Sequence, residues 1–379
     1  MRIVIVGGGV AGLTLAGHLR TRGMTPIVVE RVPEYGRVGF WIGLYPFSAN
    51  TLRETGAFER YAEESLQIGD YVMHSSDGGE LQRLSLADTL AGVGGYMGAL
   101  HRADLIDLLL TAAEGSELRM GTTVAGLDDQ GDTVGVTLST GETVEADLVV
   151  GADGIHSQTR ATLLGDLGLD DWGYTAFTWW APEDPAVGID VHEFWGAGAL
   201  LGLYPMAGKI DAIGGVPTPQ NLDEMDQAAI RAHLRETFAD YPEPVARALD
   251  ALEDGDVLPW PMVDQRSPEW IFGRVALVGD AATGFLPTAG VGASNAIKSA
   301  AVLADELGRA DAETIPHALV LWERRMRARV EGNQQDSRRL AKMMFVRGRT
   351  VAHARDLLLR HYPVEKVAEQ VMQSNTKPF

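Results

Sequence analysis

The sequence predicts an α/β fold of the Rossmann type that carries an inserted mixed β-sheet and ends in helices. Three observations predict it. The chain opens on a short apolar strand, a glycine-rich turn and a helix. Two later apolar strands each run into a glycine and an aspartate. Between these segments lie two blocks of short strands separated by glycine turns, a pattern typical of a β-sheet.

The first thirty residues have the pattern of a dinucleotide-binding unit. Gly7, Gly9 and Gly12 fit G-x-G-x-x-G between a β-branched strand and a helix, and the next strand closes on Glu30. In such a turn the first glycine bends the chain, the second lets backbone N–H groups approach a diphosphate, and the third lets the helix pack on the strand. Glu30 follows at close to the ~20-residue spacing of a carboxylate that binds ribose hydroxyls. This motif alone does not distinguish FAD from NAD.

Two further motifs follow the same logic. Residues 146–160 form an apolar strand and a glycine turn that carries Asp153. Residues 274–282 run into Gly279 and Asp280, and a proline-bounded loop then leads to a helix from about residue 293. We expect Asp280 to accept a hydrogen bond from a ribityl hydroxyl. Backbone N–H groups at the start of the helix would approach a flat ring.

In this order the three motifs resemble the FAD-dependent aromatic hydroxylases and monooxygenases of the para-hydroxybenzoate hydroxylase type, including the salicylate hydroxylase-like, zeaxanthin epoxidase-like and tetracycline-oxidising branches. The resemblance covers roughly residues 1–310. It implies three units. They are an FAD-binding domain of residues 1–70, 98–168 and 262–312, a substrate domain of residues 71–97 and 169–261, and a C-terminal helical region of residues 313–379.

The resemblance also implies which residues contact FAD. Arg102, at a predicted helix start, would approach the diphosphate, Val124 would border the adenine, and Arg37 would lie near the cofactor. A plain surface role stays open for both arginines. The residues expected at the cofactor are Gly7, Gly9, Val10, Ala11, Gly12, Glu30, Arg31, Arg37, Arg102, Val124, Asp153, Asp280, Pro287, Gly290, Gly292 and Ala293.

The two blocks of strands are expected to form one mixed sheet over the flavin. Residues 71–86 read as a hairpin, and strands are predicted at residues 175–181, 191–195, 199–204 and 210–216. The side chains expected at the substrate are Trp180, Phe194, Tyr204 and Met206. Simple packing in the sheet is the alternative for each, because strict alternation lets only every second side chain face the pocket. Tyr204, beside Pro205, is the preferred candidate.

The amino-acid composition argues against several classes of function and of site. A net charge of -20 argues against nucleic acid as a partner. The absence of cysteine excludes disulfides, thiolate nucleophiles and Cys-ligated metals, and no histidine spacing indicates a metal site. No apolar run of about 18 residues predicts a membrane span. With no signal peptide pattern, we expect a cytoplasmic monomer or homodimer.

The leading functional hypothesis is a monooxygenase that uses FAD, molecular oxygen, and NADPH or NADH as a transient co-substrate. The resemblance implies that a flavin C4a-hydroperoxide hydroxylates or epoxidises a small, largely apolar, aromatic or polycyclic substrate. No second G-x-G-x-x-G marks a separate NAD(P)H domain. Because the flavin carries this chemistry, no catalytic side chain is assigned.

Four positions depart from the family pattern. Thr283, Val291, Lys298 and Ser299 stand where the family often has histidine, glutamine and an acidic pair. The Lys298-Ser299 pair resembles the geranylgeranyl reductase branch. A reductase or dehydrogenase of a lipophilic alkene is therefore one alternative. A non-redox FAD-containing cyclase or binding protein is another.

Overall fold

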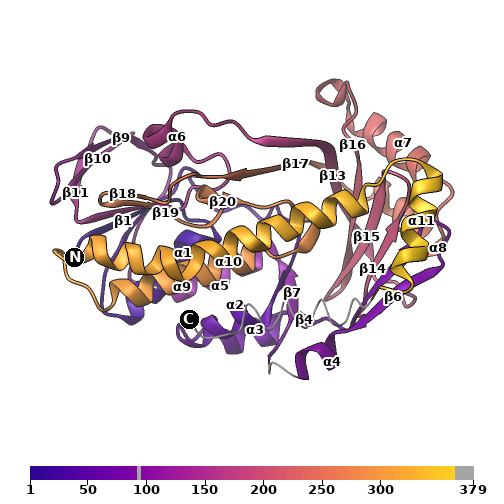
Figure 1. Ribbon diagram of the computed structural model, residues 1–379, viewed down its shortest axis with the longest axis horizontal. Helices are drawn as coiled ribbons and strands as arrows, with labels where there is room; N and C mark the ends of the chain where they lie inside the picture. The colour runs from indigo at the N-terminus through magenta and orange to yellow at the C-terminus, as the bar shows by residue number, and fades with distance from the viewer. Residues whose placement is uncertain (92–94, 363–379) are drawn as a thin grey trace.

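The computed structural model describes residues 1–91 and 95–362. The expected C-terminal helical region extends beyond them, so residues 363–379 lie outside the described part of the chain. The molecule is elongated, with a smaller parallel sheet at one end and a larger sheet at the other, and long helices run between the two (Figure 1). Within the described residues, none of the helices combines the length and apolar character that crossing a membrane requires.

The first unit is built on a six-stranded sheet. Its neighbouring strands run parallel, except for the antiparallel pair at the β18 edge. In order across the sheet the strands are β18 (Ile271–Phe272), β19 (Val275–Leu277), β12 (Leu148–Gly151), β1 (Ile3–Val6), β2 (Ile27–Val29) and β8 (Glu117–Arg119).

Both faces of this sheet are covered, which explains its apolar strands. Ile3 and Ile5 of β1 pack against one layer of the core, which contains α1 (Val10–Thr21), α5 (Arg102–Ala112) and α9 (Gly292–Leu307). Val4 and Val6 pack on the opposite side. There the cover is an antiparallel sheet of β9 (Val124–Asp129), β10 (Val134–Leu138) and β11 (Thr143–Ala146). A strand buried on both faces has no polar side, so its residues are apolar without alternation.

The second unit is an eight-stranded mixed sheet. It unites strands from two distant blocks of sequence, and β14 and β5 form its parallel pair. Its order is β20 (Thr283–Gly284), β17 (Leu258–Arg266), β13 (Asp170–Pro182), β16 (Lys209–Pro217), β15 (Leu200–Met206), β14 (Val191–Trp195), β5 (Asp70–Ser75) and β6 (Glu80–Ser85).

Helices α7 (Gln227–Thr237) and α8 (Glu243–Asp250) cover one face of the large sheet. Their apolar residues Ile230, Leu234 and Val245 are buried with Phe177 of β13. The two helices are separate: α7 ends at Thr237, and Pro242 precedes α8 in an extended conformation. Pro242 also lacks the backbone N–H that a continuous helix would need.

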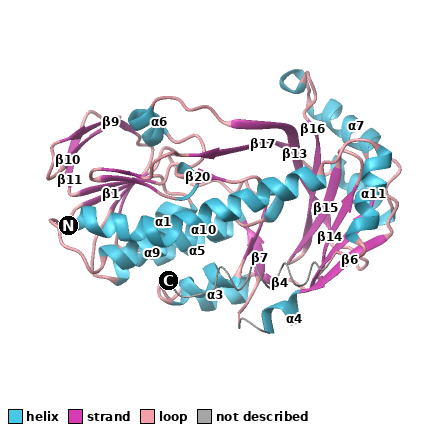
Figure 2. Ribbon diagram, viewed as in Figure 1, coloured by secondary structure: helices cyan, strands magenta, loops and turns pink. Residues whose placement is uncertain are grey.

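Three features join the two units. Strands β13 and β17 extend out of the large sheet toward the first unit (Figure 2). A small sheet of β3 (Trp41–Leu44), β7 (Gly98–His101) and β4 (Leu66–Gln67) lies between them. Helix α10 (Ile315–Met344) has 30 residues, a length of about 45 Å. It packs on α9 at one end, and at the other end Met344 is buried in the core of the large sheet, followed by α11 (Arg349–Leu359).

The remaining helices are short: α2 (Pro46–Ala49), α3 (Phe58–Glu64), α4 (Leu86–Ala91) and α6 (Gln158–Leu164). The expected fold class is confirmed: a Rossmann-like unit, an inserted mixed sheet and C-terminal helices. The bounds given to the three units stay a prediction. The border expected between residues 261 and 262 falls inside β17, which pairs with β13 on one side and β20 on the other.

Candidate active site

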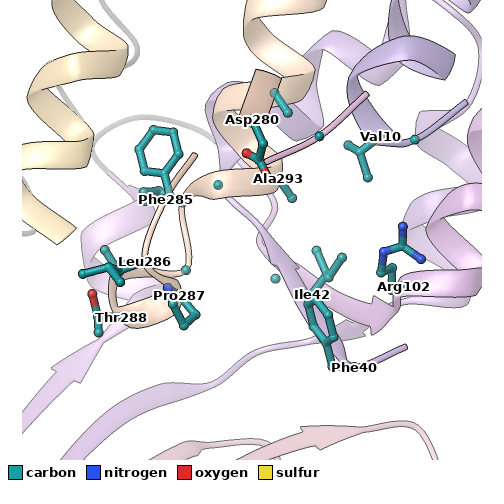
Figure 3. Close-up of a pocket in the computed structure, with 18 of the residues that line it drawn as sticks. Val10, Phe40, Ile42, Arg102, Asp280, Phe285, Leu286, Pro287, Thr288 and Ala293 are labelled. Atoms are coloured by element: carbon teal, nitrogen blue, oxygen red, sulfur yellow. The ribbon is translucent and has the colours of Figure 1, made fainter. Parts of the chain in front are cut away.

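A large cavity lies between the two units. It has a volume of about 1550 Å³ and is lined by the turn before α1, by residues 285–293 and by one face of the eight-stranded sheet (Figure 3). Pockets for one drug-sized ligand measure about 300–1,000 Å³. The cavity is therefore large enough for a dinucleotide and a second molecule together.

The turn before α1 opens directly on this cavity. Gly7 has a φ of +108°, and a Cβ there would lie 2.5 Å from the carbonyl oxygen of Ala152. A Cβ on Gly12 would overlap the carbonyl oxygen of Gly7, so helix and strand pack too closely for a side chain. Gly9 instead has open space where its Cβ would lie, and no described side chain caps α1. The first N–H groups of α1 are thus free to bind an anion.

Glu30 and Arg102 flank this turn. The Glu30 carboxylate accepts hydrogen bonds from the backbone N–H groups of Gly8, at 2.7 Å, and Val32, at 3.0 Å. These bonds fix the carboxylate at the end of β2, where it lines the cavity. Arg102 is the first residue of α5 and lies across the cavity from Asp280, on the side of Val10 (Figure 3).

A second helix start faces the same space. Gly290, with a φ of +59°, turns the chain into α9, whose N-terminus also has no side-chain cap among the described residues. Asp280 lies beside Ala293 of this helix (Figure 3), and burial raises the pKa of its carboxyl group to about 6. Asp153 also lines the cavity, while its carboxylate accepts hydrogen bonds from the Ser157 hydroxyl (2.6 Å) and other groups that start α6.

The structure brings together all but two of the sixteen residues expected at the cofactor. Gly12 lies beneath the turn and acts through packing. Arg37 requires a correction: its side chain is 71% exposed and pairs with Asp104 at 2.5 Å and Asp107 at 3.4 Å, both on α5. Exposed acidic partners hold it outside the cavity. Contact of the other residues with FAD stays a prediction.

Of the four expected substrate residues, only Tyr204 lines the cavity. Phe194 lies on the opposite face of β14, buried under α7 and α8 and stacked on His74 at 4.6 Å between ring centroids. The ring of Trp180 covers the Lys209 ammonium group at 3.6 Å. Met206 is buried at the end of β15, beyond the lining residues. Alternation along the strands explains the outcome for Phe194, because Glu193 and Trp195 occupy the cavity face.

Glu193 is the residue that sequence reasoning missed. Its side chain lines the cavity although the residue is only 3% exposed. The carboxylate accepts hydrogen bonds from the Tyr204 hydroxyl at 2.6 Å and from Nε1 of Trp195 at 2.8 Å. Burial raises the pKa of the Glu193 carboxyl group. An acid at the centre of an apolar strand was the signal that could have identified it.

The four departures from the family pattern differ in their access to the cavity. Val291 lines the cavity, and Thr283 is fully buried behind it. Lys298 and Ser299 do not line the cavity. The carbonyl oxygen of Ser299 accepts a hydrogen bond from Nε1 of Trp322 on α10 at 3.0 Å. The Lys298-Ser299 pair, on which the reductase alternative rests, therefore lies outside the lining of this cavity.

Comparison with known proteins decides the family. The family described as "FAD binding domain" matches residues 1–331 of this chain. The chain belongs to this family. As a member of the FAD binding domain family, it uses FAD as its cofactor, as the three motifs predicted.

Curated relatives in the FAD binding domain family include monooxygenases. Aurachin C monooxygenase/isomerase from Stigmatella aurantiaca is 30% identical over 310 residues, which is 80% of each chain. The 3-amino-4-hydroxybenzoate 2-monooxygenase from Streptomyces cremeus is 32% identical over 321 residues, covering 80% of this chain and 77% of the relative. The chain is accordingly an FAD-dependent oxidoreductase of the monooxygenase type. These relatives support the monooxygenase hypothesis and not the reductase alternative.

Solved structures share the fold. Klebsiella pneumoniae HpxO, in complex with FAD and uric acid, superimposes with a TM-score of 0.91 at 24% sequence identity, covering 100% of this chain and 97% of HpxO. This likeness confirms the fold over the whole length of the chain.

Proposed function

We propose that this enzyme uses NADPH or NADH and molecular oxygen to hydroxylate or epoxidise a small aromatic or polycyclic substrate held against the eight-stranded sheet. One observation carries the proposal. A continuous cavity joins the dinucleotide turn of α1 to a sheet face lined by aromatic and apolar side chains, and its volume of about 1550 Å³ exceeds what one ligand needs. We expect the protein to act in the cytoplasm as a monomer or homodimer.

The described residues fit FAD. The open N-terminus of α1 and the Arg102 guanidinium would hold the diphosphate, and Glu30 would accept from ribose hydroxyls. Asp280 would accept from a ribityl hydroxyl, and the N-terminus of α9 at Gly292 would approach the flavin ring. FAD bound there would supply electron transfer from NAD(P)H and the activation of oxygen.

The protein positions the substrate and excludes water from it. Leu286 and Pro287 lie on the loop that separates Asp280 from the large sheet, and Figure 3 shows both at the cavity. On the sheet side, Met73, Leu200 and Met262 line the wall and pack around the same core. Such a wall excludes water and favours a flat, largely apolar molecule. The aromatic substrate named for the Streptomyces relative agrees with this shape.

A labelling experiment tests the proposal. The purified holoenzyme is incubated with NADPH or NADH and a panel of phenols, N-heterocycles and polycyclic aromatics under ¹⁸O₂, and products are analysed by mass spectrometry. We expect at least one product that carries a single ¹⁸O atom. A saturated product formed without oxygen would instead favour the alkene reductase, and turnover that needs neither NAD(P)H nor oxygen would favour the non-redox alternative.

A further inference from the structure

The wall of the cavity formed by the eight-stranded sheet has one carboxyl group among its described lining residues. The described lining residues of this sheet come from β5, β6 and β13–β17, and among them Glu193 is the only acid, while lysine and arginine are absent. Arg339 also lines the cavity, but it lies on α10, is 70% exposed and pairs with Asp336 at 2.9 Å. The buried part of the substrate wall is thus negative or neutral.

Aromatic side chains surround Glu193. Trp195 and Tyr204 donate hydrogen bonds to its carboxylate, and Tyr71 lines the cavity on the neighbouring strand β5. The ring of Trp41 lies 5.1 Å from that of Tyr204. Burial, and after it the nearby Glu193, raises the pKa of the Tyr45 hydroxyl group. All five aromatic residues line the cavity. We call this group the Glu193 cage, formed by Glu193, Trp41, Tyr45, Tyr71, Trp195 and Tyr204.

Four of the five aromatic polar hydrogens of the Glu193 cage are already donated to acceptors of the protein. Nε1 of Trp41 donates to the carbonyl oxygen of Pro205 at 3.1 Å, and the Tyr45 hydroxyl donates to that of Ala289 at 3.0 Å. Nε1 of Trp195 and the Tyr204 hydroxyl donate to Glu193. A tyrosine hydroxyl that has donated its hydrogen, like a carboxylate, offers a ligand only lone pairs. The Glu193 cage therefore offers a ligand mainly hydrogen-bond acceptors.

We propose that the Glu193 cage recognises a substrate nitrogen that carries hydrogen, either a protonated amine or the N–H of an aromatic heterocycle. This inference rests on the proposed function, because it takes the cavity to be the substrate site. An N–H group satisfies the free lone pairs of the cage, and a positive charge gains from both the carboxylate and the ring faces. A substrate carboxylate placed there would meet a second acid, and its burial would be costly. Glu193 thus sets specificity and orients the ring, while the wall around it excludes water.

Two matched ligand pairs test the proposal by calorimetry on the oxidised holoenzyme. The first pair is 4-aminoquinoline, a cation at neutral pH, against the anion quinoline-4-carboxylate. The second is indole against 1-methylindole, which lacks the N–H. We expect the N–H compound of at least one pair to bind at least about tenfold more tightly, the size of one hydrogen bond to a charged group. A preference in the first pair alone would identify a cation as the ligand, and one in the second alone a neutral N–H. Equal or tighter binding of both quinoline-4-carboxylate and 1-methylindole would overturn the proposal.

Substitutions test whether Glu193 is the residue that causes the preference for N–H ligands. Glu193→Gln keeps the size of the side chain but removes the charge and adds a donor, so we expect the preference to fall at least about tenfold. Asp211→Asn is the matched control. Asp211 is also a buried acid of this sheet, bonded to the Thr178 hydroxyl and to the backbone N–H of Trp41 at 2.7 Å, but it does not line the cavity. An unchanged preference in Glu193→Gln, or an equal loss in Asp211→Asn, would contradict the assignment.

A second variant covers the case in which Glu193→Gln does not fold. Tyr204→Phe removes one hydrogen bond from Glu193 and leaves the carboxylate more open to a ligand, so the preference is expected to rise; a fall would overturn the proposal. Binding to the oxidised protein needs no turnover. Failure of the cage would therefore appear as lost ligand preference with ¹⁸O incorporation intact, whereas failure of the proposed function would appear as no labelled product with the preference intact.

Discussion

Two alanine substitutions in the opening turn should affect different properties. Gly12→Ala should lower the stability of the apoprotein, whereas Gly9→Ala should weaken FAD binding. In Gly12→Ala the added Cβ overlaps the backbone carbonyl oxygen of Gly7, which cannot move without shifting β1. Overpacking costs about 1–3 kcal/mol, and a backbone obstacle justifies the upper value. Alanine returns up to about 1 kcal/mol through its higher helix propensity. We expect the apoprotein to lose about 2 kcal/mol of unfolding free energy.

Gly9→Ala should leave the apoprotein nearly as stable as the wild type. No heavy atom lies within 4 Å of the position of its Cβ, and a φ of −82° suits alanine. The weaker N-cap preference of alanine costs less than about 1 kcal/mol. The methyl group instead occupies space that a diphosphate would use. Loss of one hydrogen bond to a charged group, about 1.5–3 kcal/mol, weakens FAD binding roughly 10- to 100-fold.

The assay separates the two effects. Urea unfolding of the apoproteins, followed by circular dichroism, gives the stability difference, and quenching of flavin fluorescence during reconstitution gives the FAD affinity. Wild-type FAD affinity in Gly9→Ala would refute the placement of the diphosphate at this turn. Wild-type stability of the Gly12→Ala apoprotein would refute the close packing of α1 on β1.

Two further predictions concern charges at the cavity. Burial raises the pKa of the Asp280 carboxyl group to about 6. The folded apoprotein therefore binds a proton at Asp280 more tightly than the unfolded chain does. As a result, Asp280 adds stability as the pH falls from about 6 to about 4. Asp280→Asn should abolish this part of the pH dependence in urea unfolding; an unchanged pH profile would contradict it. Arg102→Ala should weaken FAD binding about tenfold, whereas Arg37→Ala, an exposed pair, should change stability by less than about 1 kcal/mol and leave FAD affinity unchanged. Equal FAD losses in both variants would contradict the structure.

The residues at the cofactor end of the cavity could largely be predicted, because their motifs lie within short segments of the sequence. Each of the three motifs combines a strand, a glycine turn and a helix start within a short segment, so spacing alone predicted the positions of Gly9, Asp153 and Asp280. The hairpin of β5 and β6 was equally local. Arg37 was misplaced because its partners Asp104 and Asp107 lie on a distant helix that sequence spacing does not reveal.

The substrate side depended on contacts between distant segments. Alternation showed that Glu193 and Phe194 face opposite sides of β14, but the choice of side is made by α7 and α8, which cover the Phe194 face. Trp41 and Tyr45 reach the Glu193 cage from β3 and the residue after it, far from β14 in the sequence. No pattern within one segment could have predicted that arrangement.

An anaerobic spectral titration with NADPH, and then with NADH, tests whether this protein is an NAD(P)H-dependent flavoenzyme. We expect one of these donors, alone or with a ligand of the Glu193 cage present, to bleach the absorbance of the bound flavin, and air to restore it. A purified protein that carries no flavin and binds none on reconstitution would contradict the account. So would a bound flavin that stays oxidised with both donors, with and without ligand.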